Sequence, residues 1–167
     1  MIKKFTILNQ PIIWLDLDGV IADFNKAFKR EFGFKEDPLD WHDHRFIKDY
    51  DTISTDEKFW MNIPMLNSPN NIPFNIMGYC TSRKVDVEIT KAWLNKHRYP
   101  SKQVIQTNDK VSALRNTDCQ LFIDDCIYNY INLNNAGILT YLYSRSHNRK
   151  YLVSNRIYKL NDIIQYD

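Results

Sequence analysis

The strongest constraint on the fold is a series of five short apolar runs, each about as long as a single strand. Apolar residues occupy successive positions in every run, which is typical of strands that are buried on both faces of a sheet. Such strands belong to sheets that are mostly parallel. The runs span residues 11–17, 75–80, 103–107, 120–124 and 137–143.

Amphipathic helical patterns separate several of these runs. Val85, Ile89 and Trp93 recur every four residues within residues 84–97, so their side chains share one face of a helix. A second pattern begins at Ile127 and ends at Gly137, a residue type that commonly terminates helices. Alternating strands and helices predict an α/β fold, and the length of 167 residues fits a single core of this kind.

Residues 24–73 interrupt the alternation, because they contain no convincing buried strand. Prolines divide this segment, and short helices are predicted over residues 25–32, 44–50 and 55–62. We therefore predict a main unit made of residues 1–23 and 74–167, with residues 24–73 inserted after the first strand. Such an insertion can cover the carboxyl ends of the strands, where ligands bind in open α/β folds.

The composition argues against non-specific binding to polyanions. The chain has 22 Lys and Arg against 20 Asp and Glu, a formal net charge of +2, so recognition of phosphate must be local. Polar residues break the apolar run at the N-terminus, which resembles neither a signal peptide nor a membrane span. We expect a cytoplasmic protein, and the abundance of Asn, Ile, Lys and Tyr fits an AT-rich genome such as that of a phage or a low-GC bacterium. The three cysteines lack CxxC spacing and are expected to be buried and reduced: Cys80, Cys119 and Cys126.

Two carboxylates stand where the first strand ends. Asp16 and Asp18 alternate, so in an extended backbone both point the same way, and Gly19 lets the chain turn tightly. The alternative is a pair of acids that only form turn hydrogen bonds. Two acids this close in a partly buried site repel each other unless a cation joins them.

A second acidic pair, Asp124 and Asp125, follows the apolar run QLFI. If the two strands are neighbours, three or four carboxylates converge on one spot. Oxygen ligands of this kind favour a hard divalent cation, which in a cell is Mg²⁺. Coincidental turn acids are the alternative, but two acid pairs at two strand ends demand a larger coincidence than one.

Other strand ends carry hydrogen-bond donors and cations. Thr81, Ser82 and Arg83 follow the second run, and Lys110 lies just beyond the third. Taken singly, a threonine at a strand end is more often a helix cap and a lysine is more often solvated. Their order along the chain is what carries information.

The order DxDGV, Thr, Lys and Asp-Asp, each after a strand, resembles the haloacid dehalogenase superfamily of phosphohydrolases. The segments DLDGVIADF, FWMNIP, CTSR, Asp109-Lys110, FIDD and His147-Asn148 are similar to those of its 5'(3')-deoxyribonucleotidase branch. The resemblance implies a Rossmann-like core with a small helical cap, here residues 24–73. It also implies removal of phosphate from nucleoside monophosphates and a possible homodimer. The TSR turn is shared with many general phosphatases of the superfamily.

The resemblance implies roles for individual residues. Asp16 would be the nucleophile that forms an aspartyl phosphate, and Asp18 would be the general acid and then the general base. Mg²⁺ would be held by the Asp16 side chain, the Asp18 backbone carbonyl, and a carboxylate of Asp124 or Asp125. The sequence does not divide direct from water-mediated roles between these last two.

The resemblance also implies that Thr81 binds a phosphoryl oxygen and that Lys110 balances the negative charge. On the substrate side, Phe24 matches the position whose ring contacts the base. Trp60, Ser82 and Arg83 are further candidate substrate contacts. His42 and His44 are expected to be surface residues, since no further metal ligands lie near them in the sequence.

Two other functions are compatible with the residues. A basic stretch near the C-terminus could be a solvated face or could bind a larger substrate, such as the phosphorylated end of a nucleic acid; another small phosphorylated metabolite is also possible. A binding module without catalysis would not need both acids of the first strand. The basic residues are Arg145, His147, Arg149, Lys150, Arg156 and Lys159.

Overall fold

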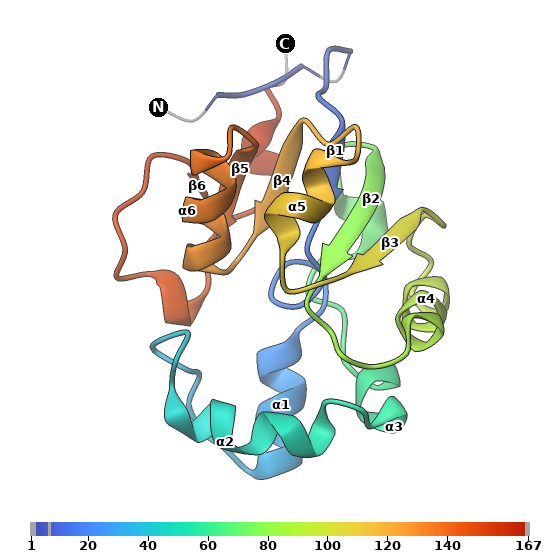
Figure 1. Cartoon of the computed structure of the whole chain (residues 1–167), viewed down its shortest axis with the longest axis vertical. Helices are drawn as coiled ribbons and strands as arrows, with labels where there is room; N and C mark the ends of the chain where they lie inside the picture. The colour runs from blue at the N-terminus through green and yellow to red at the C-terminus, as the bar shows by residue number, and fades with distance from the viewer. Residues whose placement is uncertain (1–2, 7, 166–167) are drawn as a thin grey trace.

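The computed structural model describes residues 3–6 and 8–165 and contains one six-stranded sheet in the order β3-β2-β1-β4-β5-β6 (Figure 1). Every pair of neighbouring strands is parallel. The α/β class and the parallel sheet are therefore confirmed. The strands are β1 (Ile13–Leu15), β2 (Ile76–Thr81), β3 (Gln103–Gln106), β4 (Leu121–Asp124), β5 (Leu139–Tyr143) and β6 (Arg156–Ile157).

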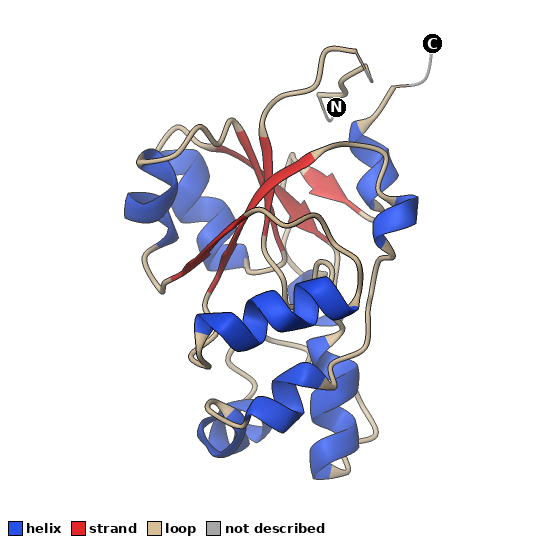
Figure 2. Ribbon diagram, turned by 90° about the vertical axis from the view of Figure 1, so that its right-hand side faces the viewer, coloured by secondary structure: helices blue, strands red, loops and turns tan. Residues whose placement is uncertain are grey.

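Helices flank the sheet (Figure 2). They are α1 (Phe24–Phe32), α2 (His44–Ile53), α3 (Glu57–Met61), α4 (Val87–Lys96), α5 (Lys110–Arg115) and α6 (Ile127–Asn135), with short 3₁₀ helices η1 (Pro69–Asn71), η2 (Ser146–Asn148) and η3 (Leu160–Ile163). An aspartate side chain accepts a backbone hydrogen bond at the start of each of α1 to α5, which satisfies a donor that the helix itself leaves free. The sequence patterns missed α5 and β6, because six and two residues are too short to show a period.

The sheet separates two apolar layers. Ile13 and Leu15 belong to the larger core cluster, whereas Trp14 belongs to a second cluster with Phe122 and Leu133. The ring of Trp14 lies against Gly78, where a Cβ atom would come within 2.4 Å of it. The central strand is therefore buried on both faces, as its continuous apolar run predicts.

The register of β1 places the acidic motifs side by side. Leu15 pairs with Ile123 of β4 on one side and with Tyr79 of β2 on the other. The backbone N–H of Asp16 then donates to the carbonyl of Ile123 at 2.9 Å. Asp16 and Asp124 are thus brought to the same edge of the sheet.

The helices α1, α2 and α3 lie together at one end of the molecule, facing the carboxyl ends of the strands (Figure 1). The helices predicted for this segment are confirmed. Contacts with α4 join the end of this helical segment to the sheet region. The indole N–H of Trp93 donates to the carbonyl of Ile63 at 2.8 Å, and Lys96 donates to the carbonyl of Met61 at 2.7 Å. The division of the chain into a core and a cap stays a prediction.

Within the described residues, no helix is both long enough and apolar enough to cross a membrane. All three cysteines are free thiols, as predicted. Cys80 and Cys126 are buried and Cys119 is half-buried. Burial raises the pKa of the Cys80 thiol to about 12, so this side chain behaves as a small apolar group.

Candidate active site

The loop after β1 sets the position of the first acid. Asp16 is 6% exposed, and its Oδ1 accepts a hydrogen bond from the backbone N–H of Leu17 at 2.7 Å. The carbonyl of Leu17 then accepts from the N–H groups of Val20, Ile21 and Ala22, which closes a tight turn. Gly19 has φ of +80°, and a Cβ atom there would come within 1.7 Å of Asp125 Oδ2. Glycine is therefore required both by the turn and by the neighbouring carboxylate.

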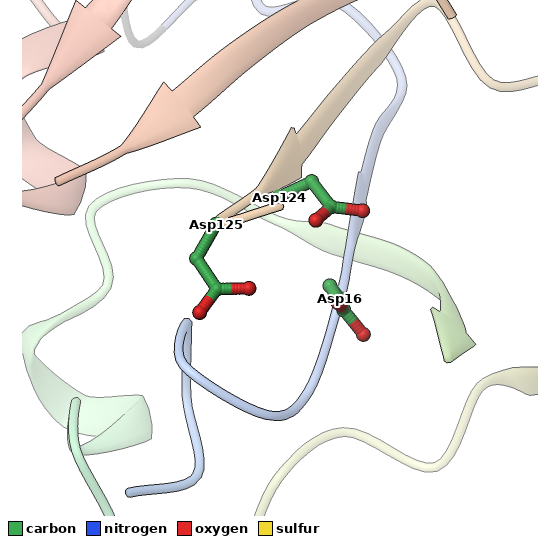
Figure 3. Close-up of side chains that lie close together, drawn as sticks. All are labelled: Asp16, Asp124 and Asp125. Atoms are coloured by element: carbon green, nitrogen blue, oxygen red, sulfur yellow. The ribbon is translucent and has the colours of Figure 1, made fainter. Parts of the chain in front are cut away.

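Three buried carboxylates converge at this point. Asp16, Asp124 and Asp125 each offer an oxygen, and these oxygens all lie within 4.8 Å of one another (Figure 3). Burial raises the pKa of Asp16 well above its usual value, and the two neighbouring carboxylates add to the rise. Burial likewise raises the pKa of Asp125. The predicted convergence is found for three carboxylates.

Asp18 does not join this group. Because β1 ends at Leu15 and the chain then turns, Asp16 and Asp18 do not continue one extended strand, but both line one cavity, and the expectation that they address one point there stays a prediction. The Asp18 carboxylate instead pairs with Arg83, whose Nε and Nη2 donate at 2.8 and 2.7 Å. Its backbone carbonyl as a metal ligand stays a prediction.

Lys110 neutralises part of the acidic group. Its Nζ lies 2.8 Å from Asp16 Oδ2 and 2.8 Å from Asp124 Oδ2, and its side chain is 2% exposed. Burial lowers the pKa of Lys110, but the two carboxylates outweigh burial and hold it above its usual value. Lys110 is therefore a permanent cation in the floor of the site.

The two acids at the end of β4 have different partners. Asp124 is fully engaged, since it accepts from the N–H of Cys126 at 2.7 Å and from Asn129 at 3.0 Å in addition to Lys110. Asp125 Oδ2 lies 3.3 Å from Nε2 of His147, whereas its Oδ1 is buried with no partner among the described residues.

His147 contacts both the carboxylate and the backbone carbonyl of Asp125. Its Nε2 is also 3.2 Å from the carbonyl oxygen of Asp125, to which Asn148 donates at 2.8 Å. Burial lowers the pKa of His147, but the hydrogen bond and charge of Asp125 outweigh it and raise the pKa overall. The pair His147 and Asn148, noted in the sequence, thus supports the second acidic motif.

The turn after β2 places further donors beside the acids. Thr81 is 1% exposed, and its hydroxyl oxygen is buried without a partner in the described part of the chain. Ser82 is exposed, and its hydroxyl donates to the carbonyl of Thr107 at 3.2 Å. Thr81 is therefore the free hydroxyl donor, and Ser82 is already used.

A cavity of about 440 Å³ lies above the acids. Asp16, Thr81 and Asp125 line it, and Phe24, Tyr50 and Trp60 add an aromatic wall. Its ring pairs are Phe24 with Trp60, stacked at 5.8 Å, and Phe24 with Tyr50, tilted at 6.1 Å. Trp60 is 1% exposed and its indole N–H donates to Ile53 and Ser54 carbonyls, so its main role is to support the wall.

Several residues of the cavity were not predicted as site residues. They are Tyr50, Asn108, Asn129 and His147. Burial raises the pKa of Tyr50 to about 12, so its hydroxyl is neutral at physiological pH. Two of the four had a signal in the sequence: His147 belongs to a segment that resembles the family, and Asn108 stands two residues before Lys110 at a strand end. The others lie on helices or turns whose path the sequence patterns do not define.

The C-terminal basic stretch is not a continuous solvated face. His147 is buried at Asp125, and Arg156 donates to the carbonyls of Asn148 and Tyr151 at 2.9 and 2.6 Å. Arg145 pairs with Asp23 at 2.9 Å, and Lys150 pairs with Asp40. Most of these cations are already used within the chain. His42 and His44 are exposed, as predicted.

No known family model matches the chain. Among curated proteins, a protein from Clostridium acetobutylicum named as a nucleotidase is 28% identical over 184 aligned residues. The alignment covers 93% of this chain and 93% of that protein. The similarity extends over nearly the full length of both chains and supports a hydrolase that acts on nucleotides.

Proposed function

We propose that this protein is a Mg²⁺-dependent phosphatase of the haloacid dehalogenase type that hydrolyses nucleoside monophosphates to nucleoside and phosphate. The main supporting observation is the convergence of three buried carboxylates and Lys110 at a cavity that aromatic side chains also line. The similarity to a nucleotidase supports the substrate class. Resemblance in the motifs supports the type of chemistry.

The residues fit a divalent cation. Asp125 Oδ1 is a buried carboxylate oxygen without a partner, next to a second carboxylate whose pKa burial raises. The three clustered carboxylates, Asp16, Asp124 and Asp125, face one permanent cation, Lys110, which leaves two negative charges to be neutralised. Asp16 and Asp125 would hold Mg²⁺. Both oxygens of Asp124 already accept hydrogen bonds, so Asp124 would act indirectly, through its contacts with neighbouring residues of the site. When bound, Mg²⁺ would draw charge from the phosphoryl oxygens.

The chain's own residues divide the chemistry between them. A carboxylate oxygen of Asp16 would attack phosphorus, and the bond from phosphorus to the nucleoside oxygen would break. Asp18 would give a proton to that leaving oxygen. In the second step Asp18 would take a proton from water, whose oxygen bonds to phosphorus while the bond to Asp16 breaks. Thr81 would donate to a phosphoryl oxygen through its free hydroxyl.

The aromatic wall gives a reason to favour nucleosides over small phosphorylated metabolites. Phe24 is half-buried at the cavity, and a base stacked on such a ring gains about 1 to 3 kcal/mol. A nucleic-acid end as the substrate has less support, because most of the basic residues that suggested it are paired within the chain. A homodimer and a cytoplasmic location stay predictions.

The test is phosphate release from a panel of nucleoside 5'- and 3'-monophosphates, with Mg²⁺ and with a chelator. We expect release that needs Mg²⁺ and is lost in Asp16→Asn. A 5'-phosphorylated oligonucleotide serves as the second substrate class. The proposal fails if no nucleotide is hydrolysed, or if Asp16→Asn and the wild type release phosphate equally.

A further inference from the structure

The guanidinium of Arg83 is buried in an unusual place. The residue is 3% exposed and its side chain is completely enclosed. The guanidinium carbon lies 4.9 Å from the centre of the Trp60 ring and 5.2 Å from that of Trp93, so an aromatic ring from α3 and another from α4 pack against it. Burying a charge in this way is unfavourable unless a partner compensates it.

The compensating partner is Asp18. Nε and Nη2 of Arg83 reach the two carboxylate oxygens of Asp18 in a fork-like pair, while Nη1 is buried and has no partner among the described residues. The Asp18 side chain is 22% exposed. The buried arginine therefore holds a carboxylate that stays accessible from the cavity.

The backbone around Arg83 is also fixed. Gln106 of β3 donates through Nε2 to the carbonyl of Arg83 at 3.1 Å and to that of Val85 at 2.7 Å. The arginine is thus held by its backbone, by two indole rings and by its ion pair. A side chain fixed in so many ways can define the orientation of its partner.

The ion pair separates Asp18 from the metal-binding acids. Asp16 and Asp124 share Lys110, whereas Asp18 has Arg83 as its cation. Arg83 stacks on Trp60, and Trp60 stacks on Phe24, so the Asp18 carboxylate is tied to the aromatic wall where the nucleoside would lie. Asp18 and Phe24 line the same cavity, so in the proposed reaction the Asp18 carboxylate would face the leaving oxygen of the nucleoside.

We propose that Arg83 is a positioning residue that orients the Asp18 carboxylate toward the leaving oxygen and keeps it out of the metal-binding group. This inference rests on the proposed function. It replaces the expectation that Arg83 contacts substrate, because two of its three nitrogens already bind Asp18 and the third is enclosed. Arg83 acts through Asp18 alone.

The test compares two leaving groups in single turnovers with enzyme in excess. A nucleoside is a poor leaving group that needs a proton, whereas 4-nitrophenolate needs none. In Arg83→Gln we expect nucleoside release from the monophosphate to slow at least 100-fold, and release of 4-nitrophenolate from 4-nitrophenyl phosphate to slow less than 5-fold. The KM for the nucleotide, measured separately at steady state with substrate in excess, should change less than threefold.

Three further variants sharpen the comparison. Arg83→Lys keeps the charge but not the fork, so it should recover only part of the lost rate. The double variant Asp18→Asn with Arg83→Gln should release nucleoside no more slowly than Asp18→Asn alone, because both changes remove the same function. Arg45→Gln is the matched control, because Arg45 makes a similar forked pair with Asp43 on the surface and outside the cavity.

The outcomes separate the inference from the proposed function. If wild type and Arg45→Gln release no nucleoside, the proposed function itself is wrong. The other outcome concerns an active wild type and variants that circular dichroism shows to be folded. If Arg83→Gln or Arg83→Lys slows release of both leaving groups equally, or raises the KM tenfold, then Arg83 binds substrate or supports the fold. The positioning role is then refuted.

Discussion

Replacing the proposed nucleophile Asp16 by asparagine should stabilise the metal-free protein even as it removes the proposed activity. With an effective dielectric constant of about 20, repulsion between Asp16 and each of the two other acids amounts to about 3 kcal/mol at 4.8 Å. Attraction between Asp16 and Lys110 at 2.8 Å amounts to about 6 kcal/mol in the same medium. The Coulomb contributions nearly cancel, so the cost of burying the charge decides the sign.

That burial cost makes the neutral side chain the more stable one. Burial raises the pKa of Asp16 well above 3.8, which means that the folded protein disfavours the carboxylate. Asp16→Asn removes the charge with little change of shape, and we expect a gain of about 1 to 3 kcal/mol. For a chain of this size each kcal/mol corresponds to about 2 to 4 °C in Tm.

The pH dependence supplies a control. An acid with a raised folded pKa stabilises the fold most below its unfolded pKa, and this contribution is lost as the pH rises through the folded value. The advantage of Asp16→Asn should therefore grow from pH 5 to pH 8. Thermal unfolding in a chelator across this range measures it.

Mg²⁺ should reverse the order of stability. The wild type gains Tm with added Mg²⁺ by mass action, whereas the variant, with one carboxylate fewer, gains less. A Tm for Asp16→Asn below that of the wild type at pH 8 in a chelator would refute the reasoning, since it would mean that the ion pair with Lys110 outweighs burial and repulsion.

Three other changes test separate parts of the site. Lys110→Met leaves two buried acids without their cation and should cost about 3 to 5 kcal/mol of stability in urea unfolding without metal. Gly19→Ala places a Cβ atom 1.7 Å from Asp125 Oδ2 at a φ of +80°, so calorimetric titration should show loss of Mg²⁺ binding. Trp93→Phe removes the N–H that satisfies the Ile63 carbonyl and should lower stability by about 1 to 3 kcal/mol, measured by thermal unfolding.

The sequence predicted the centre of the sheet well because its strands there are short and apolar. Burial on both faces leaves an apolar signal in all of β1 and in β4 up to Ile123, and the acids at the two strand ends stand out against it. The adjacency of Asp16 and Asp124 then follows from parallel pairing of the two strands. Period and polarity were sufficient for this part of the site.

Contacts made by loops were not predictable in the same way. The strand pattern did not predict that the chain turns after Leu15 or that the Asp18 carboxylate pairs with Arg83. His147 reaches Asp125 from a 3₁₀ turn beyond β5, and its neighbours in the sequence suggested a solvated basic face. Such contacts depend on the path of the backbone between elements, which residue patterns do not encode.

The long stretch of chain between β1 and its partner strands affects how the protein is made. This three-residue strand leaves the ribosome early, yet its partners begin at Ile76 and Leu121. Asp16 meets neither Lys110 nor Asp124 until the chain beyond Asp124 has been synthesised, and the apolar strand before it has no sheet to join. A nascent chain that stops short of β4 therefore carries the proposed nucleophile without its site, and the site can form only after β4 has been made.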